Sequence, residues 1–191
     1  MVSAKELFGA MSGIVAFLAI VPYFLSLRAG KTKPSQASWW VWTLGNLLLM
    51  IGYIHLGEIT AAVLPGANVV RNIFIIIVSE KYGHSEWRKV DQVCLGVAIG
   101  SIIPWMLFKD PIWTIVILVG INIAGAISTM AKQIWQKGRE DIITWIILSA
   151  AGLMMFLSLE DYGFKTMLFP VYLFLIGIPV IAIEMLLAKR K

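Results

Sequence analysis

The chain has 191 residues, of which 59% are hydrophobic and only 14% charged, and its mean hydropathy is +0.84. A soluble domain of this size is nearer half apolar and a quarter charged, so the composition excludes a water-soluble globule and predicts an integral membrane protein. The net charge of +5 is spread over short loops rather than gathered in a basic arm or helix, which favours anionic lipid headgroups over nucleic acid as partners.

Apolar stretches long enough to cross a bilayer follow one another along the chain and predict seven transmembrane helices. In chain order they cover residues 8–27, 39–57, 59–79, 92–108, 112–131, 142–159 and 166–188. Polar or Gly/Pro-containing segments separate them, and the shortest connection, HLGE at 55–58, predicts a tight hairpin. The first stretch is too long for a signal-peptide core and is not followed by a small-x-small cleavage site, so we expect it to be retained.

Basic residues divide unequally between the two sets of loops that seven helices create. The N-terminus and the second, fourth and sixth loops contain three of them, namely Lys5, Lys109 and Lys165. The other set contains twelve: Arg28, Lys31, Lys33, Lys81, Arg88, Lys89, Lys132, Lys137, Arg139, Lys189, Arg190 and Lys191. The positive-inside rule then predicts a protein of the cell membrane with its N-terminus outside and its C-terminus in the cytoplasm.

The chain also resembles itself at an offset of about 106 residues. The segment RAGKTKPSQASWW at 28–40 aligns with IWQKGREDIITWI at 134–146. The paired residues are Lys31 with Lys137, Ser38 with Thr144, Trp39 with Trp145, Gly57 with Gly163 and, with one residue of slip, Pro65 with Pro170. The first three helices therefore match the last three, and the fourth helix joins them.

This match predicts an all-α fold of two parallel three-helix repeats joined by a linker helix, a 3+1+3 arrangement. The first repeat would occupy residues 1–80, the linker 81–110 and the second repeat 111–191. In the linker helix, Gly96 and Gly100 form a GxxxG motif, which predicts close packing against another helix.

The arrangement, together with the segment VPYFLSLRAGKT, resembles the PQ-loop superfamily, which includes the SWEET sugar transporters. Pro22 stands near the inner end of the first helix and Lys31-Thr32 in the next loop, as in that superfamily, although Tyr23 replaces the usual glutamine. In the second repeat, Ser128-Thr129 replaces the proline-glutamine pair. The resemblance implies a transporter fold in which Pro22 acts as a hinge in gating. The second repeat has no proline at the matching position and so lacks this hinge.

In SWEET-like proteins, asparagines of helices three and seven and tryptophans of helices two and six surround the sugar. Here the third helix offers Asn68 or Asn72, but the seventh has no asparagine. We expect the tryptophans of the second and sixth helices to lie at the inner ends rather than to face a mid-membrane pocket. The resemblance therefore does not imply that the substrate is a sugar.

Polar residues gather near the middle of the membrane. Asn68, Arg71 and Asn72 share one face of the third helix, because they are spaced i, i+3, i+4. Arg71 lies roughly 18 Å from the outer end of a ~30 Å core, and Asn46 and Asn122 come to about the same depth. Repeat-built transporters place their substrate at this depth, so these five residues are the predicted substrate-binding group. The alternative is that the asparagines only join helices.

Arg71 needs a partner, a cavity or a ligand, since a charge at mid-depth cannot easily reach the interface. A substrate or gating role stands beside a structural ion pair or a carbonyl clamp. Its obvious carboxylate partner is Glu184 in the seventh helix, and such a pair would form an inner gate. Glu184 lies only about one turn from the inner end, where Lys189 or water is an alternative partner.

Three tryptophans, Trp39, Trp40 and Trp42, begin the second helix at the inner interface, where aromatic belts form. Trp39 and Trp42 share a face, while Trp40 is rotated by about 100° from Trp39. At least one of them should therefore point into the bundle. Because Trp145 is the repeat match of Trp39, we expect these two to pair as an inner gate or packing contact.

The sequence contains no catalytic motif, and His55 and His84 have no second ligand at metal spacing, so we expect no enzyme, metal or cofactor. The leading hypothesis is a small transporter or facilitator for a small polar metabolite, working by alternating access between the repeats. Arg71 would favour an anionic or zwitterionic solute. The alternatives are a ligand-binding receptor or sorting protein on the same scaffold and a non-transporting structural or lipid-binding membrane protein; a homo-oligomer stays open.

Overall fold

A computed structural model of the chain describes residues 3–107, 111–136 and 138–189. Within these ranges there are nine helices and no strand. In chain order they are α1 (Ala4–Leu18), α2 (Ile20–Arg28), α3 (Gln36–His55), α4 (Ile59–Tyr82), α5 (Lys89–Gly100), α6 (Ile102–Leu107), α7 (Pro111–Gln136), α8 (Ile142–Ser158) and α9 (Phe164–Ala188).

Proline accounts for two helix breaks, so the nine helices make seven rods. Pro22 lacks the N–H that would bond to the carbonyl of Leu18, and its ring crowds that carbonyl, so α1 ends at Leu18 and α2 begins at Ile20. Pro104 stands in the same relation to Gly100, where α5 ends. The seven rods match the seven apolar stretches of the sequence to within a few residues.

Six rods are long and apolar enough to cross a membrane: Ala4–Arg28, Gln36–His55, Ile59–Tyr82, Lys89–Leu107, Ile115–Gln136 and Phe164–Ala188. The seventh, α8, is apolar but has 17 residues, which gives it a length of about 25 Å. Large apolar side chains such as Ile77, Ile143 and Ile178 stay more than half exposed on the outside of the bundle. The prediction of an all-α, membrane-embedded protein is therefore confirmed.

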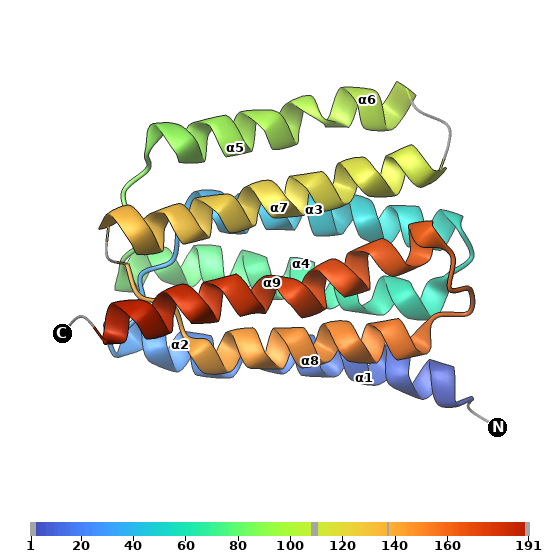
Figure 1. Cartoon of the computed structure of the whole chain (residues 1–191), viewed down its shortest axis with the longest axis horizontal. Coiled ribbons are helices and arrows are strands. Elements are labelled where there is room, and N and C mark those ends of the chain that lie inside the picture. Colours follow the sequence, from blue (N-terminus) through green and yellow to red (C-terminus); the bar gives the residue numbers. More distant parts are fainter. Residues whose placement is uncertain (1–2, 108–110, 137, 190–191) are drawn as a thin grey trace.

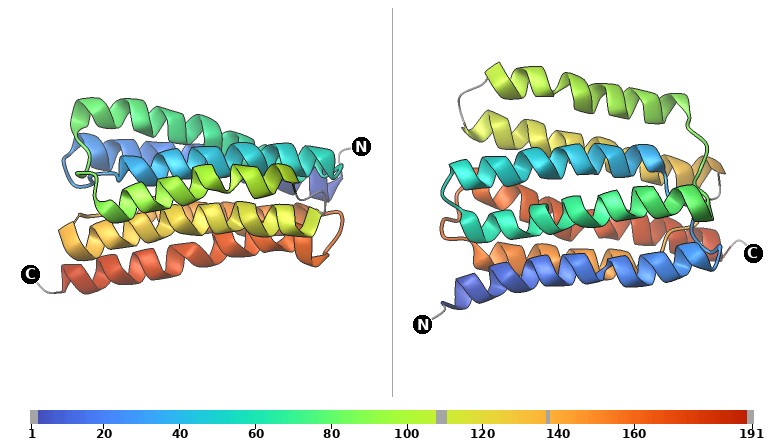
Figure 2. Two further views of the ribbon diagram at one scale, coloured as in Figure 1. Left: turned by 90° about the horizontal axis from the view of Figure 1, so that it is seen from above. Right: turned by 180° about the vertical axis from the view of Figure 1, so that it is seen from behind.

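Six of the rods form a ring. Following the packing contacts, the ring runs from α1 to α4, α3, α7, α9, α8 and back to α1, with α2 continuing α1 (Figure 1). The rod of α5 and α6 lies outside it, where α5 packs against α3 and α7 and α6 against α7 (Figures 1 and 2). The six rods of the ring therefore surround the interior of the bundle, and the rod of α5 and α6 does not face it.

The loops gather at two ends of the bundle. The connections after α2, α4 and α7 and the end of α9 lie at one end, on the left of Figure 1, which we call the basic end because most of the lysines and arginines lie there. The start of α1 and the turns after α3 and α8 lie at the opposite end. The turn after α3 is the expected hairpin, in which Gly57 adopts a φ of 79°.

Glycines bring several rods close together, but not at the expected motif. A Cβ atom on Gly13 of α1 would lie 2.6 Å from Val63 of α4, and one on Gly152 of α8 would lie 2.8 Å from the backbone of Phe174 in α9. A Cβ atom on Gly96 or Gly100, by contrast, would meet nothing within 4 Å in the described part of the chain. The prediction that this GxxxG pair packs a helix is wrong within the chain, because α5 turns that face away from the ring.

Candidate functional site

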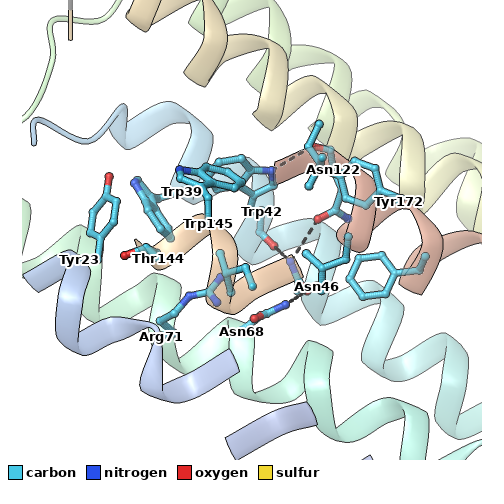
Figure 3. Close-up of a pocket in the computed structure, with 14 residues that line it drawn as sticks. Tyr23, Trp39, Trp42, Asn46, Asn68, Arg71, Asn122, Thr144, Trp145 and Tyr172 are labelled. Carbon is cyan, nitrogen blue, oxygen red and sulfur yellow. Dashed lines mark hydrogen bonds between the residues drawn. The ribbon is translucent and has the colours of Figure 1, made fainter. Parts of the chain in front are cut away.

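A cavity lies inside the ring, and all six of its rods contribute side chains (Figure 3). Its volume, measured as the space open to the centres of water molecules, is about 30 Å³, which is room for one or two waters and too little for a sugar. The polar or aromatic residues in its wall are Tyr23, Trp39, Trp42, Asn46, Asn68, Arg71, Asn122, Thr144, Trp145, Phe169 and Tyr172. The remaining wall consists of Leu148, Leu173 and Ile176.

Four of the five predicted substrate-binding residues line this one cavity: Asn46, Asn68, Arg71 and Asn122. They come from α3, α4 and α7, and each is at most 4% exposed. The fifth, Asn72, lies behind the wall, where its Oδ1 accepts a 3.0 Å hydrogen bond from Nη2 of Arg71. The depth argument from the sequence therefore brought together residues that are far apart in the chain.

The three asparagines of the wall form a hydrogen-bonded chain with a fixed direction. Asn122 Nδ2 donates to the carbonyl of Leu118 at 2.9 Å, which leaves its Oδ1 to accept from Asn46 Nδ2 at 3.2 Å. Asn46 Nδ2 also donates to the carbonyl of Trp42 at 2.8 Å, and Asn46 Oδ1 accepts from Asn68 Nδ2 at 3.0 Å. Because backbone carbonyls only accept, each amide can have one orientation, and the chain ends at Asn68 Oδ1, which has no partner.

The backbone carbonyl of Asn122 holds two further wall residues in place. It accepts one hydrogen bond from Trp42 Nε1 and another from the hydroxyl of Tyr172, both at 2.9 Å. The sequence prediction did not include either residue. Trp42 stands four positions before Asn46, on the same face of α3, and this spacing was the signal that could have identified it.

Arg71 is 4% exposed and its guanidinium points from α4 into the cavity (Figure 3). Nη1 donates to the carbonyl of Ala16 at 3.1 Å, and the guanidinium carbon lies 5.8 Å from the centre of the Trp39 ring. Nε is buried without a hydrogen-bond partner. Among the described residues no carboxylate pairs with Arg71, so the cavity wall carries an uncompensated positive charge.

The suggested pair between Arg71 and Glu184 is not formed. Glu184 is 2% exposed and its carboxylate pairs with Arg139. It also accepts hydrogen bonds from Gln133 Nε2 at 3.2 Å and from the backbone N–H of Glu140 at 2.9 Å. These partners lie in α7 and the α7–α8 connection, so Glu184 ties that connection to α9 near the basic end; a gating role for it stays a prediction.

The tryptophans differ from the expectation in two ways. Trp39 and Trp145 do not form the expected ring pair, because Trp42 lies between them. The centre of the Trp42 ring is 5.2 Å from that of Trp39 and 5.8 Å from that of Trp145. All three line the cavity, so the expectation that they would lie away from a central pocket is wrong. The helix-face argument itself holds, since Trp40 is 47% exposed while Trp39 and Trp42 are buried.

A buried ion pair adjoins Trp145 of the cavity wall, toward the basic end. Lys132 of α7 is fully buried and pairs with Glu140. Glu140 Oε2 accepts a 3.2 Å hydrogen bond from Trp145 Nε1, and Lys132 Nζ donates to the carbonyl of Lys33 at 2.7 Å. Sequence reasoning counted Lys132 only as a loop charge, because the helix was expected to end at residue 131 whereas α7 continues to Gln136.

Pro22 itself does not line the cavity, but the helix break that it causes adjoins the site. Ala16, whose carbonyl accepts from Arg71, lies in the last turn of α1 before the break. Tyr23, which follows Pro22, does line the cavity, and its ring meets that of Trp39 at 5.0 Å. A movement at the break would therefore displace a partner of Arg71, and the gating role of Pro22 stays a prediction.

Within the described ranges, no three His, Cys, Asp or Glu side chains lie close enough together to hold a metal ion. Lys137, which the repeat alignment pairs with Lys31, is outside the described residues, as are Lys109, Arg190 and Lys191.

Comparison of the chain with protein-family models, with curated proteins and with solved structures finds no match. Inferences about function therefore rest on the cavity and its walls.

Proposed function

We propose that the protein is a small membrane transporter or facilitator for a small polar metabolite, working by alternating access between two three-helix units. The observation that carries this proposal is the buried charge of Arg71 in the wall of the central cavity, unpaired with any carboxylate of the described residues. A charge inside a membrane protein is costly and needs a function. A solute that binds there would supply the missing partner.

The two units would be α1 to α4 and α7 to α9, with α5 and α6 as the linker. In the ring, α4 lies between α1 and α3, and α9 lies between α7 and α8. The two units then contact each other at two places, where α3 packs against α7 and where α8 packs against α1. These two contacts are equivalent, because each joins the second helix of one unit to the first helix of the other. This contact order is what a parallel repeat about an axis along the membrane normal would produce.

Equivalent positions of the two units also have equivalent environments. At the offset of 106, the helix-capping residue Ser35 corresponds to Asp141, and each accepts a hydrogen bond from the backbone N–H three residues later. Trp39 and Trp145 correspond and both line the cavity. At the offset of 105, taken from the match of Pro65 with Pro170, Asn68 corresponds to Leu173 and Arg71 to Ile176, and all four line the cavity.

Contacts between the units are found at both ends of the cavity. Toward the basic end, Lys132 binds the carbonyl of Lys33, and the hydroxyls of Ser35 and Ser128 lie 3.0 Å apart. Toward the opposite end, the hydroxyl of Tyr53 donates to the carbonyl of Thr166 at 3.1 Å. Alternating access would break these two sets of contacts in turn. The positive-inside rule favours a cytoplasmic location for the basic end.

The pairing of Glu184 with Arg139 weakens the non-transporting alternative. A structural or lipid-binding protein would satisfy its buried arginine internally, either by an ion pair, for which Glu184 was the candidate, or by a carbonyl clamp, of which the bond to Ala16 is one contact. Arg71 instead keeps Nε unpartnered beside a cavity that can hold water. A ring with a buried charge next to a central cavity supports solute binding rather than a purely structural role.

Uptake into proteoliposomes across a panel of anionic, zwitterionic and neutral solutes tests the proposal. We expect at least one solute to enter faster than into empty liposomes. For that solute, Arg71→Ala should lower uptake by about tenfold or more, because a charged hydrogen bond is lost, and Asn72→Ala should lower it less. Arg28→Ala, at an exposed arginine at the end of α2, is the matched control and should leave uptake unchanged. Transport of the panel is excluded if no solute exceeds the empty-liposome rate.

A further inference from the structure

Arg71 and Asn68, two residues that line the cavity, each contain a buried polar atom without a hydrogen-bond partner. These atoms are Nε of Arg71 and Oδ1 of Asn68, from residues 4% and 2% exposed. The two residues are three positions apart on α4, so their side chains lie on the same face. In the view of Figure 3, the oxygen end of the Asn68 amide is the end nearer Arg71. Arg71 and Asn68 therefore offer a charged donor and an acceptor from the same face of α4.

The chemical character of each atom is determined by its surroundings. Nε of a guanidinium can only donate, and its charge favours an anionic acceptor. Asn68 must present its oxygen, because its Nδ2 donates to Asn46 Oδ1 and the amide chain through Asn46 and Asn122 has one direction. A ligand that satisfies both atoms needs an anionic group and, close to it, a hydrogen-bond donor.

We infer that the cavity binds a small 2-hydroxycarboxylate, with the carboxylate on Arg71 and the hydroxyl donating to Oδ1 of Asn68. The inference rests on the proposed function for the identity of the site and adds the class of the solute. A carboxylate is planar and accepts from a guanidinium with good geometry. The 2-hydroxyl is a donor next to the carboxylate, as an acceptor on the same helix face as the arginine requires.

The donor is a hydroxyl rather than an ammonium because of the charge in the wall. None of the residues that line the cavity is an Asp or a Glu, so a zwitterion would leave one positive charge buried without compensation. A monoanion compensates Arg71 fully. Opposite α4 in the ring, α9 contributes Phe169, Tyr172, Leu173 and Ile176 to the wall. The one polar atom among these side chains, the hydroxyl of Tyr172, already donates to the carbonyl of Asn122.

The size of the cavity limits the solute to a few non-hydrogen atoms. In this closed conformation it has room for one or two water molecules, so even a small acid requires the units to separate slightly. Glycolate, the smallest 2-hydroxycarboxylate, is therefore the probe that we choose. Acetate keeps the charge without the hydroxyl, and glycolamide keeps the hydroxyl without the charge.

Binding is measured with the full chain in lipid nanodiscs, by calorimetry and by tryptophan fluorescence, to which Trp39, Trp42 and Trp145 of the cavity wall respond. We expect the Kd of glycolate to be about tenfold or more below those of acetate and glycolamide, because acetate leaves Oδ1 of Asn68 unpaired and glycolamide leaves the charge of Arg71 uncompensated. Asn68→Leu should remove the preference for glycolate over acetate and retain the binding of acetate. Arg71→Gln should weaken both anions, and Arg28→Gln is its control.

The wild-type comparison alone can overturn the inference, whether or not a variant folds. Equal affinities for glycolate and acetate, equal affinities for glycolate and glycolamide, or no response to any of the three would each refute it. In the last case the two unpaired atoms only bind water. A loss of the glycolate preference in Arg28→Gln would also contradict the assignment to this site.

Flux measurements separate this inference from the proposed function. Net movement of glycolate alone carries one negative charge, so an inside-positive membrane potential should accelerate its uptake, whereas leakage of the protonated acid is electroneutral. If glycolate binds with the expected preference but is not transported, the ligand class stands and the transport proposal fails. If a neutral solute is transported while glycolate neither binds nor competes, the transport proposal stands and the inference fails.

Discussion

Removal of Lys132 is the sharpest test of the closed basic end. Its side chain is fully buried and holds three acceptors, namely the carboxylate of Glu140, the carbonyl of Lys33 at 2.7 Å and the carbonyl of Arg139 at 3.4 Å. Lys132→Met keeps most of the aliphatic volume and removes the charge. The carboxylate of Glu140, also buried, then retains its hydrogen bond from Trp145 but has lost its cationic partner.

The expected cost follows from leaving that carboxylate uncompensated. Removing one partner of a buried ion pair costs about 3–5 kcal/mol. For a chain of this size, 1 kcal/mol changes Tm by about 2–4 °C, so Lys132→Met should lower Tm by about 6–20 °C. Lys132→Met combined with Glu140→Gln should recover more than half of that loss, because no charge is then left buried without a partner.

Thermal unfolding in nanodiscs, followed by tryptophan fluorescence, provides the measurement. Lys189→Met is the matched control, since Lys189 is exposed at the end of α9 and should change stability by less than about 0.5 kcal/mol. A Tm for Lys132→Met equal to that of the control would refute the importance of the pair. A double variant no more stable than Lys132→Met would show that the buried charge of Glu140 is not the cause of the loss.

Two further substitutions test the packing of the cavity wall and the closure of its opposite end. A Cβ atom on Gly125 would lie 2.5 Å from Trp42 Nε1, so Gly125→Ala should displace the indole and cost about 1–3 kcal/mol in the same unfolding assay. Gly120→Ala on the same helix meets nothing within 4 Å and should be neutral or slightly stabilising; equal effects of the two would contradict the contact. Tyr53→Phe should cost about 0.5–1.5 kcal/mol by removing the bond to Thr166, and an unchanged Tm would mean that this bond does not hold the end closed.

The rods could be predicted from the sequence because the bilayer imposes a length and a composition on them. Every apolar stretch of about 20 residues became a rod. The breaks at Pro22 and Pro104 are explained by the lost bond to the carbonyl four residues earlier, but this rule alone does not predict them, because α4 and α9 continue through Pro65, Pro170 and Pro179. The depth of Asn46, Arg71 and Asn122 could be counted at a fixed rise per residue. That count, with no knowledge of the ring, was enough to bring these residues to one cavity.

Contacts between rods could not be predicted in the same way, since they depend on how each helix is rotated and on which rod lies between two others. Trp39 and Trp145 were expected to meet, but the rotation of α3 places Trp42 between them. Glu184 lies on α9 at a position that faces α7 and Arg139 rather than α4. Lys132 was counted as a loop charge because the expected helix ended at residue 131. Its partners could not be identified because they lie in two different loops, 8 and 99 positions away.

Under the proposed repeat, the asymmetry of the cavity would explain how two units share one task. At the positions that the proposed repeat makes equivalent, α4 places Asn68 and Arg71 in the wall and α9 places Leu173 and Ile176 there. Two arginines at these positions would face each other across a cavity with room for one or two waters, and their mutual repulsion at low dielectric would oppose closure. A single arginine avoids this cost and needs only one anionic group to become neutral. The first unit would then bind the solute, while the second contributes an apolar wall and, through Lys132 and Glu140, the contact that keeps the basic end closed.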